Sequence, residues 1–179
     1  MAAIGEQSLG WFSAERVEVA PDVAGLVRDY SGLLYRVAFS VLRNSAEAED
    51  VVQDCFVRVL QKGKLSTVAE FRPWLVKITW NLALDRRRRV RPEQMDEVFA
   101  AGLVAVNLPA DLAIAEAGRM TKVLAAIERL PGKEREALLL SAMEELSTAE
   151  IGAVLGRSES SVRSLLFRAR TRLRERLGE

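Results

Sequence analysis

The chain has 179 residues, about half of them hydrophobic, which is ample for a folded core and too many for a disordered chain. It contains no histidine and a single cysteine, which excludes histidine-based triads, histidine metal sites, intramolecular disulfides and multi-cysteine zinc sites. The 26 basic and 25 acidic residues nearly cancel, so the net charge of +1 says nothing about partners. The charge distribution is more informative, because acidic and basic residues gather in separate segments.

Apolar residues recur at the helical period in nearly every long segment, and no segment sustains strand-like alternation. We therefore expect an all-α protein of two small helical domains joined by a linker, without a metal or cofactor. Residues 1–20 have little pattern and are predicted to form a flexible N-terminal arm. They lack the features of a secretory signal, and no apolar run approaches the roughly 18–20 residues of a membrane span. We expect a cytoplasmic protein that does not insert into membranes.

Two helices are predicted in the first sixty residues. The first covers about 22–42, and Ser31 and Gly32 mark a point where it could break. Its expected apolar side consists of Val23, Leu26, Val27, Leu33, Leu34, Val37, Val41 and Leu42. The second helix begins near Ser45, a potential cap followed by acidic residues that suit the helix dipole. Its expected buried residues are Val52, Cys55, Phe56, Val59 and Leu60, and its opposite face carries Asp50, Gln53, Asp54 and Arg58.

A polar loop over 61–71 is predicted to precede a third helix that runs from Pro73 to about Arg89. Proline suits the first turn of a helix, where its missing N–H costs little. The helix ends in four consecutive arginines, Arg86, Arg87, Arg88 and Arg89, and the chain then reaches Pro92. Lys77, Trp80, Asn81 and Arg88 lie on or near its predicted exposed stripe, although Trp80 could equally pack against the preceding helices.

Four further helices are predicted after an irregular linker, at about 111–129, 132–143, 148–155 and 159–177. Ser147 and Glu150 form a capping-box pattern at the start of the third of these. Gly152, Gly156 and Val162 have the spacing of a helix-turn-helix, in which the small residue permits close approach and the second glycine makes the turn. The pattern favours a DNA-binding unit over a merely solvated basic helix.

In a helix-turn-helix, the N-terminal part of the second helix reads bases in the major groove, while nearby basic side chains hold phosphates. The residues expected to contact DNA here are Ser158, Ser160, Ser161, Arg163, Ser164, Phe167, Arg168 and Arg170.

The motifs AEDVVQDCFVRVL, FRPWLVKITWNLALDRRRR and LPGKEREALLL, followed by LSTAEIGAVLGRSESSVRSLLFRARTRL, resemble in order those of the bacterial extracytoplasmic-function (ECF) sigma factors of the sigma-70 family. The resemblance covers nearly the whole chain. It implies a sigma region 2 domain over 21–91, a linker over 92–110 and a sigma region 4 domain over 111–179. The implied function is to bind core RNA polymerase and direct promoter recognition, −10 melting and transcription initiation, under the control of an anti-sigma factor.

The resemblance also assigns roles to surfaces. Asp50, Gln53, Asp54 and Arg58 are expected to dock on core polymerase, whose beta and beta-prime subunits are the implied partners. The −10 element is expected to meet the loop over 63–70 and the third helix, through Lys64, Ser66, Thr67, Lys77, Trp80, Asn81, Arg86, Arg87, Arg88 and Arg89. The helix-turn-helix residues are expected to read the −35 element. Asp85 is expected to pair with a neighbouring arginine, and Leu165 stands where the family often has a basic residue.

Other functional classes explain less of the sequence. A sigma-like mimic that only titrates an anti-sigma factor predicts eroded basic residues, whereas the arginines here are intact. A ligand-sensing helix-turn-helix repressor leaves the motifs of the first half unexplained. An enzyme is the weakest option, because we find no nucleophile–base pair, phosphate loop or metal cluster.

Overall fold

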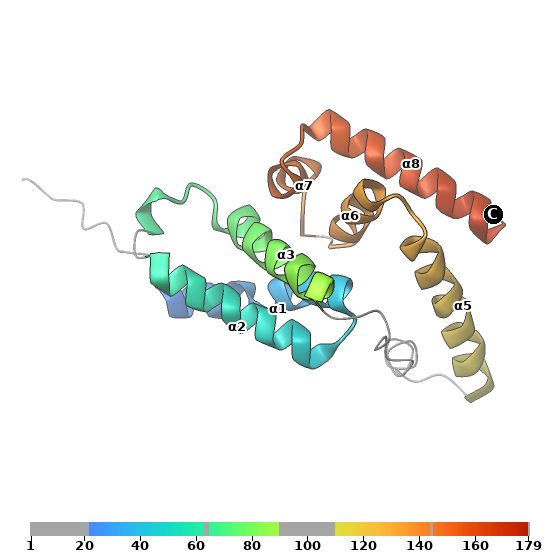
Figure 1. Cartoon of the computed structure of the whole chain (residues 1–179), viewed down its shortest axis with the longest axis horizontal. Helices are drawn as coiled ribbons and strands as arrows, with labels where there is room; N and C mark the ends of the chain where they lie inside the picture. The colour runs from blue at the N-terminus through green and yellow to red at the C-terminus, as the bar shows by residue number, and fades with distance from the viewer. Residues whose placement is uncertain (1–21, 63–64, 90–109, 144, 179) are drawn as a thin grey trace, which may run out of the picture.

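Helices account for the regular structure in the part of the chain that the computed structural model describes, which confirms the all-α prediction (Figure 1). The described ranges are 22–62, 65–89, 110–143 and 145–178, with side chains described from 118 onward in the third range. The predicted arm, Lys64 and the linker lie outside them, except that Ala110 begins a helix. The elements are α1 (Val23–Leu42), α2 (Ser45–Lys62), a 3-10 turn (Leu65–Thr67), α3 (Phe71–Arg89), α5 (Ala110–Glu128), α6 (Gly132–Ser141), α7 (Thr148–Leu155) and α8 (Glu159–Leu177).

The first three helices pack on one another around a common core. Asp22 caps α1, because its Oδ1 accepts a hydrogen bond of 3.0 Å from the backbone N–H of Ala24. The helix then continues through Ser31 and Gly32, so the predicted break is wrong. Leu33 and Leu34, directly after this pair, are buried in the core, and such packing outweighs a glycine cost of about 1 kcal/mol.

The predicted buried row of α2 is confirmed for Cys55, Phe56 and Val59 and is wrong at its two ends, where Val52 is only half-buried and Leu60 is exposed. The row seen in the structure is Ala48, Val51, Cys55, Phe56 and Val59. Because these residues define the buried stripe at the helical period, Leu60 falls beside it and is 62% exposed. Val27 of α1 is likewise 39% exposed, at the edge of the predicted apolar side.

The loop before α3 is shorter than predicted. A 3-10 turn with buried Leu65 occupies part of it, and α3 begins at Phe71. Pro73 is therefore the third residue of α3, still within the first turn, where a backbone N–H has no intrahelical partner.

Helices α7 and α8 form the predicted helix-turn-helix. The capping box is confirmed: Ser147 Oγ accepts from the N–H of Glu150 at 3.2 Å, and Glu150 Oε2 accepts from the N–H of Ser147 at 2.8 Å. Gly156 ends α7 in the left-handed conformation, with φ of 64°. An alanine methyl at Gly152 would lie 2.6 Å from the carbonyl oxygen of Arg157, so the turn requires glycine at 152.

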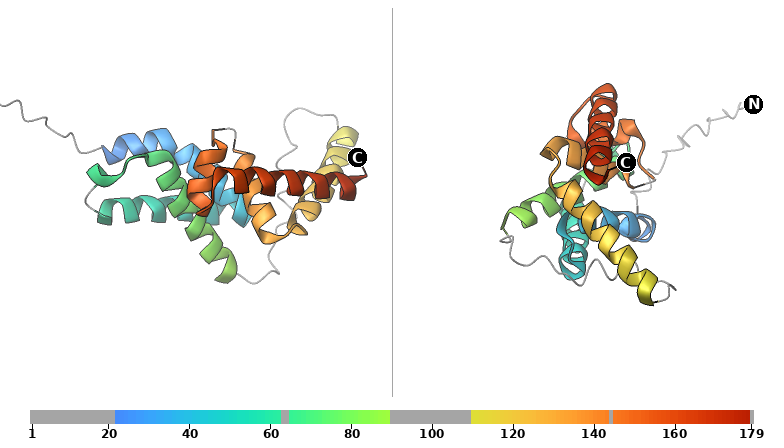
Figure 2. Two further views of the ribbon diagram at one scale, coloured as in Figure 1. Left: turned by 90° about the horizontal axis from the view of Figure 1, so that it is seen from above. Right: turned by 90° about the vertical axis from the view of Figure 1, so that its right-hand side faces the viewer.

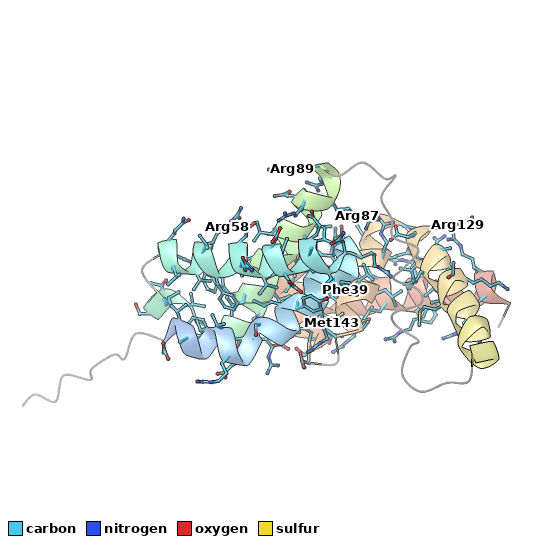
Figure 3. All side chains as sticks on the ribbon, turned by 90° about the horizontal axis from the view of Figure 1, so that it is seen from below. Phe39, Arg58, Arg87, Arg89, Arg129 and Met143 are labelled. Carbon is cyan, nitrogen blue, oxygen red and sulfur yellow. The ribbon has the colours of Figure 1, made fainter. Side chains whose placement is uncertain are left out.

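The two halves of the chain pack against each other. In Figures 1 and 2, α6, α7 and α8 lie together on one side of the N-terminal helices, and α3 contacts α7 while α1 contacts α6. Phe39 of α1 and Met143, labelled in Figure 3, are partly buried against the same hydrophobic cluster. Buried residues of both halves therefore form one continuous core, an arrangement that the sequence pattern did not predict.

Candidate nucleic-acid interface

Helix α8 divides cleanly into a buried and an exposed face. Val162, Leu165, Leu166 and Ala169 are buried, as predicted. The predicted DNA-contacting residues lie on the other side, all of them exposed except Ser161, which is half-buried. Phe167 is 71% exposed, the most exposed large hydrophobic side chain in the described part of the chain. An aromatic ring held in solvent beside arginines is suited to apolar contact with a base.

The serines at the start of α8 interact with one another. Ser158 is the N-cap, and its Oγ accepts from the N–H of Ser161 at 3.3 Å. The hydroxyls of Ser160 and Ser161 lie 3.1 Å and 2.9 Å from the same oxygen. Ser164 donates to the carbonyl of Ser160 at 3.0 Å. These bonds orient short hydroxyl groups along the end of the helix that a helix-turn-helix presents to DNA.

Two arginines of the exposed face are held by carboxylates. Arg163 pairs with Glu159 at 2.5 Å, and Glu159 also accepts a hydrogen bond of 2.7 Å from the hydroxyl of Thr148 in α7. The bond from Thr148, and then Arg163, lowers the pKa of Glu159. Arg168 pairs with Glu134 of α6 at 3.4 Å. Arg168 is therefore held directly by α6, whereas Arg163 is held by an acid of its own helix that Thr148 of α7 contacts.

A basic hollow of about 400 Å³ lies beside the start of α8. Its cations are Lys133, Arg157 and Arg168, and its remaining lining is Ser160, Ser161, Ser164 and Leu165. Three cations and several hydroxyl donors around one hollow suit an anionic group such as a DNA phosphate. Lys133 and Arg157 were not among the predicted residues, because only folding brings the start of α6 and the α7–α8 turn beside α8.

The predicted polymerase-docking residues share an exposed face of α2. Asp50, Gln53, Asp54 and Arg58 are all exposed, and Figure 3 shows Arg58 on the outer side of the helix. Arg86 of α3 reaches this face, where it pairs with Asp50 at 2.8 Å and Asp54 at 3.7 Å.

Glu47 also pairs with Arg86. One of the four consecutive arginines therefore neutralises part of the acidic face, and its predicted role on −10 DNA competes with this intramolecular role.

On α3 the predicted residues have different environments. Lys77, Asn81, Arg88 and Arg89 are exposed, and so are Ser66 and Thr67 in the 3-10 turn. Trp80 is only 2% exposed, so its prediction as a surface stacking ring is corrected in favour of the packing alternative. The reason is that α3 contacts α1, α2 and α7, which widens its buried stripe to include Thr79, Trp80 and Ala83. The predicted ion pair of Asp85 is confirmed, with Arg88 at 3.4 Å.

Arginines of the N-terminal helices pair with acids of the C-terminal helices. Arg36 forms two hydrogen bonds with the carboxylate of Glu145, at 2.6 and 2.7 Å. Arg72 donates to the carbonyl of Glu145 at 2.9 Å and pairs with Glu150 at 3.4 Å. These contacts and the Arg87–Glu128 pair described next are together called the interdomain clasp.

The third contact of the clasp involves the arginine run itself. Arg87 pairs with Glu128 of α5 at 2.6 Å, and Arg135 of α6 lies 3.4 Å from the same carboxylate. Figure 3 labels Arg87 on the side of α3 nearest α5, whereas Arg89 stands at the far end of the helix. Arg36, Arg72 and Arg87 are all in the first half, and the acids that they contact are all in the second. The facing surfaces of the two halves therefore carry complementary charges.

We expect Arg36→Glu to separate the two halves of the free protein. Because the side chains of Arg36 and Glu145 are each 50% exposed, the pair contributes about 1 kcal/mol or less. Reversing the charge of Arg36 should therefore raise the ratio of open to closed molecules by roughly fivefold. Energy transfer between dyes on Ala46→Cys and Glu175→Cys would measure the separation. Native Cys55 should stay unlabelled, because burial raises the pKa of its thiol.

The matched control for this experiment is Arg28→Glu, the same charge change on α1 at a residue that pairs only with Asp29 in the described part of the chain. Adding Glu145→Arg to Arg36→Glu should restore the closed population. Equal transfer in Arg36→Glu and Arg28→Glu would contradict a role for the clasp.

Within the described ranges there is no group of three or more acidic, cysteine or histidine residues that could hold a metal ion. Among the described helices, none has the length and apolar character needed to cross a membrane.

Comparison with known proteins agrees with this geometry. A family model described as Sigma-70 region 2 matches residues 26–93, and one described as Sigma-70, region 4 matches residues 120–173. The ECF RNA polymerase sigma factor SigE of Mycolicibacterium smegmatis is 37% identical over 86% of this chain, which spans 61% of that relative. The ECF RNA polymerase sigma factor SigM of Mycobacterium tuberculosis is 32% identical over 86% of this chain and 76% of its own length.

Solved structures share this helical fold. CnrH, solved in complex with the cytosolic domain of CnrY, has a TM-score of 0.64 at 26% identity and covers 87% of each chain. The sigma factor RpoE of Bartonella quintana, solved with the anti-sigma factor NepR, shares the fold, with a TM-score of 0.59 at 22% identity over 87% of this chain and 96% of that one. The chain therefore belongs to the extracytoplasmic-function RNA polymerase sigma factors of the sigma-70 family, which are transcription initiation factors.

Proposed function

We propose that this protein recruits core RNA polymerase to a specific set of promoters by reading their −35 element with α8. The observation that carries the proposal is the exposed face of α8, on which Arg163, Ser164, Phe167 and Arg168 stand together with a helix-turn-helix behind them. Ser158, Ser160, Ser161 and Arg170 extend the same surface. Lys133 and Arg157, in the hollow beside it, add phosphate contacts that hold α8 in register.

The N-terminal unit binds core polymerase and the opened −10 element. The acidic face of α2, with Asp50, Gln53, Asp54 and Arg58, is its polymerase-docking surface. Its −10 surface consists of Lys64, Ser66, Thr67, Lys77, Asn81 and the arginines 86–89. Trp80 is left out because it is buried. Asn81 offers an amide to a base edge, and the arginines hold phosphates in a salt-dependent way without reading sequence.

The closed arrangement is the state of the free protein. Opening releases Arg87 from Glu128 for DNA and separates the −35 surface from the −10 surface. Residues 92–110 are the predicted linker between the proposed domains 21–91 and 111–179. A partner that clasps both halves would keep the protein inactive. The relatives CnrH and RpoE were solved with CnrY and NepR, and we propose an anti-sigma factor for this chain too.

On this proposal the protein acts beside polymerase in the cytoplasm and catalyses no reaction itself. The test is reconstitution of the purified chain with bacterial core RNA polymerase on genomic DNA, followed by mapping of transcript starts. The proposal predicts a shared two-part motif upstream of the starts, and only weak binding of that DNA by the protein alone. Tight duplex binding that represses transcription without association with core would overturn it.

A further inference from the structure

A buried carboxylate lies beneath the DNA-facing surface of α8. Glu134 is 5% exposed, and it is the one buried charged residue in the described part of the chain. It lies in the first turn of α6, whose positive helix end favours an acid, and its backbone N–H donates to the carbonyl of Pro131 at 2.9 Å. The start of α6 therefore fixes the position of this carboxylate.

Both partners of Glu134 come from α8. Arg168 approaches Oε1 at 3.4 Å and Arg172 approaches Oε2 at 3.0 Å, one helical turn apart. Because a buried, unpaired carboxylate is strongly disfavoured, two guanidinium groups that compensate it are also held in place by it. The closest approach to each carboxylate oxygen is made by an Nε atom, and in the described part of the chain no hydrogen bond joins either arginine to Glu134.

The pairing leaves the arginines able to bind a second group. Oε2 of Glu134 forms no hydrogen bond in the described part of the chain, so its interaction with Arg172 is one of charge without directional geometry. The side chains of Arg168 and Arg172 remain 52% and 48% exposed. A guanidinium whose Nε lies nearest the carboxylate still has the outer N–H of each terminal nitrogen, and these two can form a fork to guanine O6 and N7.

We propose that Glu134 is a positioning residue for −35 recognition, which aims the fork of Arg168 at one base pair through the buried charge pair. This inference rests on the proposed function of α8 and deepens it. Restricting the guanidinium before DNA arrives lowers the ordering cost of binding, so the contribution is to discrimination between bases. For DNA of any sequence, Glu134 is expected to lower the binding affinity, since it is a negative charge near DNA phosphates.

The test compares Glu134→Gln with wild type in holoenzyme, on a promoter found by transcript mapping and on its single base-pair variants at −35. The base pair read by Arg168 is the one at which Arg168→Ala loses discrimination, by about tenfold. Glu134→Gln should lose roughly fivefold in discrimination at that base pair alone. Its binding to a non-promoter duplex should stay equal or become tighter. In an Arg168→Ala background, Glu134→Gln should have no further effect on discrimination.

Glu136→Gln is the matched control, the same charge change on α6 at a residue without an ion pair in the described part of the chain, and it should retain wild-type discrimination. A second measurement needs neither DNA nor transcription: the order parameter of the Arg168 Nε–H bond from nuclear relaxation should be higher in wild type than in Glu134→Gln, because the charge pair restricts the side chain. Equal losses at all −35 base pairs, unchanged discrimination, or an unchanged order parameter would each overturn the inference. Wild-type holoenzyme that ignores the −35 sequence would instead overturn the proposed function.

Discussion

The Gly152→Ala variant is expected to lose about 2–3 kcal/mol of unfolding free energy, as overpacking of a tight contact does. A methyl group at this position would lie 2.6 Å from the carbonyl oxygen of Arg157, which is backbone and cannot move aside cheaply. The turn is anchored at the same place, since the N–H of Arg157 donates to the carbonyl of Gly152 at 2.8 Å. Alanine's better helix propensity offsets only about 1 kcal/mol of the clash.

Urea unfolding followed by circular dichroism would measure this loss, and Gly118→Ala is its matched control. Gly118 lies within α5, is exposed, and has open space where a methyl group would go. There alanine should be neutral or stabilise the protein by up to about 1 kcal/mol. If Gly152→Ala were as stable as Gly118→Ala, the close approach of the turn to α7 would be refuted.

The helix-turn-helix could be predicted almost residue by residue because its signals are local. The cap at Ser147, the left-handed Gly156 and the small Gly152 each depend on neighbours within a few positions. The bounds of α7 and α8 follow from such caps, which explains their agreement with the structure. Periodicity alone was weaker evidence, since it placed Leu60 on the wrong side of the buried stripe.

What escaped prediction depends on contacts between segments far apart in the sequence. Trp80 is buried because α3 is covered from several sides, and its own helix carries no sign of that. The four consecutive arginines looked equivalent, yet Arg86 turns to the acids of α2, Arg87 to Glu128 and Arg88 to Asp85. An arginine run therefore indicates a basic surface, and the partners of each member decide which ones DNA can reach.

The last prediction concerns base recognition. Replacing Arg163 or Arg168 with alanine should each cost about tenfold in discrimination at one −35 base pair, and together roughly a hundredfold in promoter-specific initiation. The two losses should combine nearly independently, because the arginines are held by different acids, Glu159 and Glu134. Initiation by holoenzyme on single base-pair variants of the mapped promoter would measure both.

Arg174→Ala provides the comparison for these variants, since Arg174 is exposed near the other end of α8, away from the turn that would enter the groove. A phosphate contact there would weaken binding to all sequences alike and reduce its salt dependence. Discrimination should therefore be unchanged in Arg174→Ala even if affinity falls. If Arg163→Ala and Arg168→Ala also lowered affinity uniformly, both would be phosphate contacts, and base reading would have to rest on Ser164 and Phe167. In that case the specificity of α8 would come from the hydroxyl of Ser164 and the exposed ring of Phe167, and not from arginine side chains.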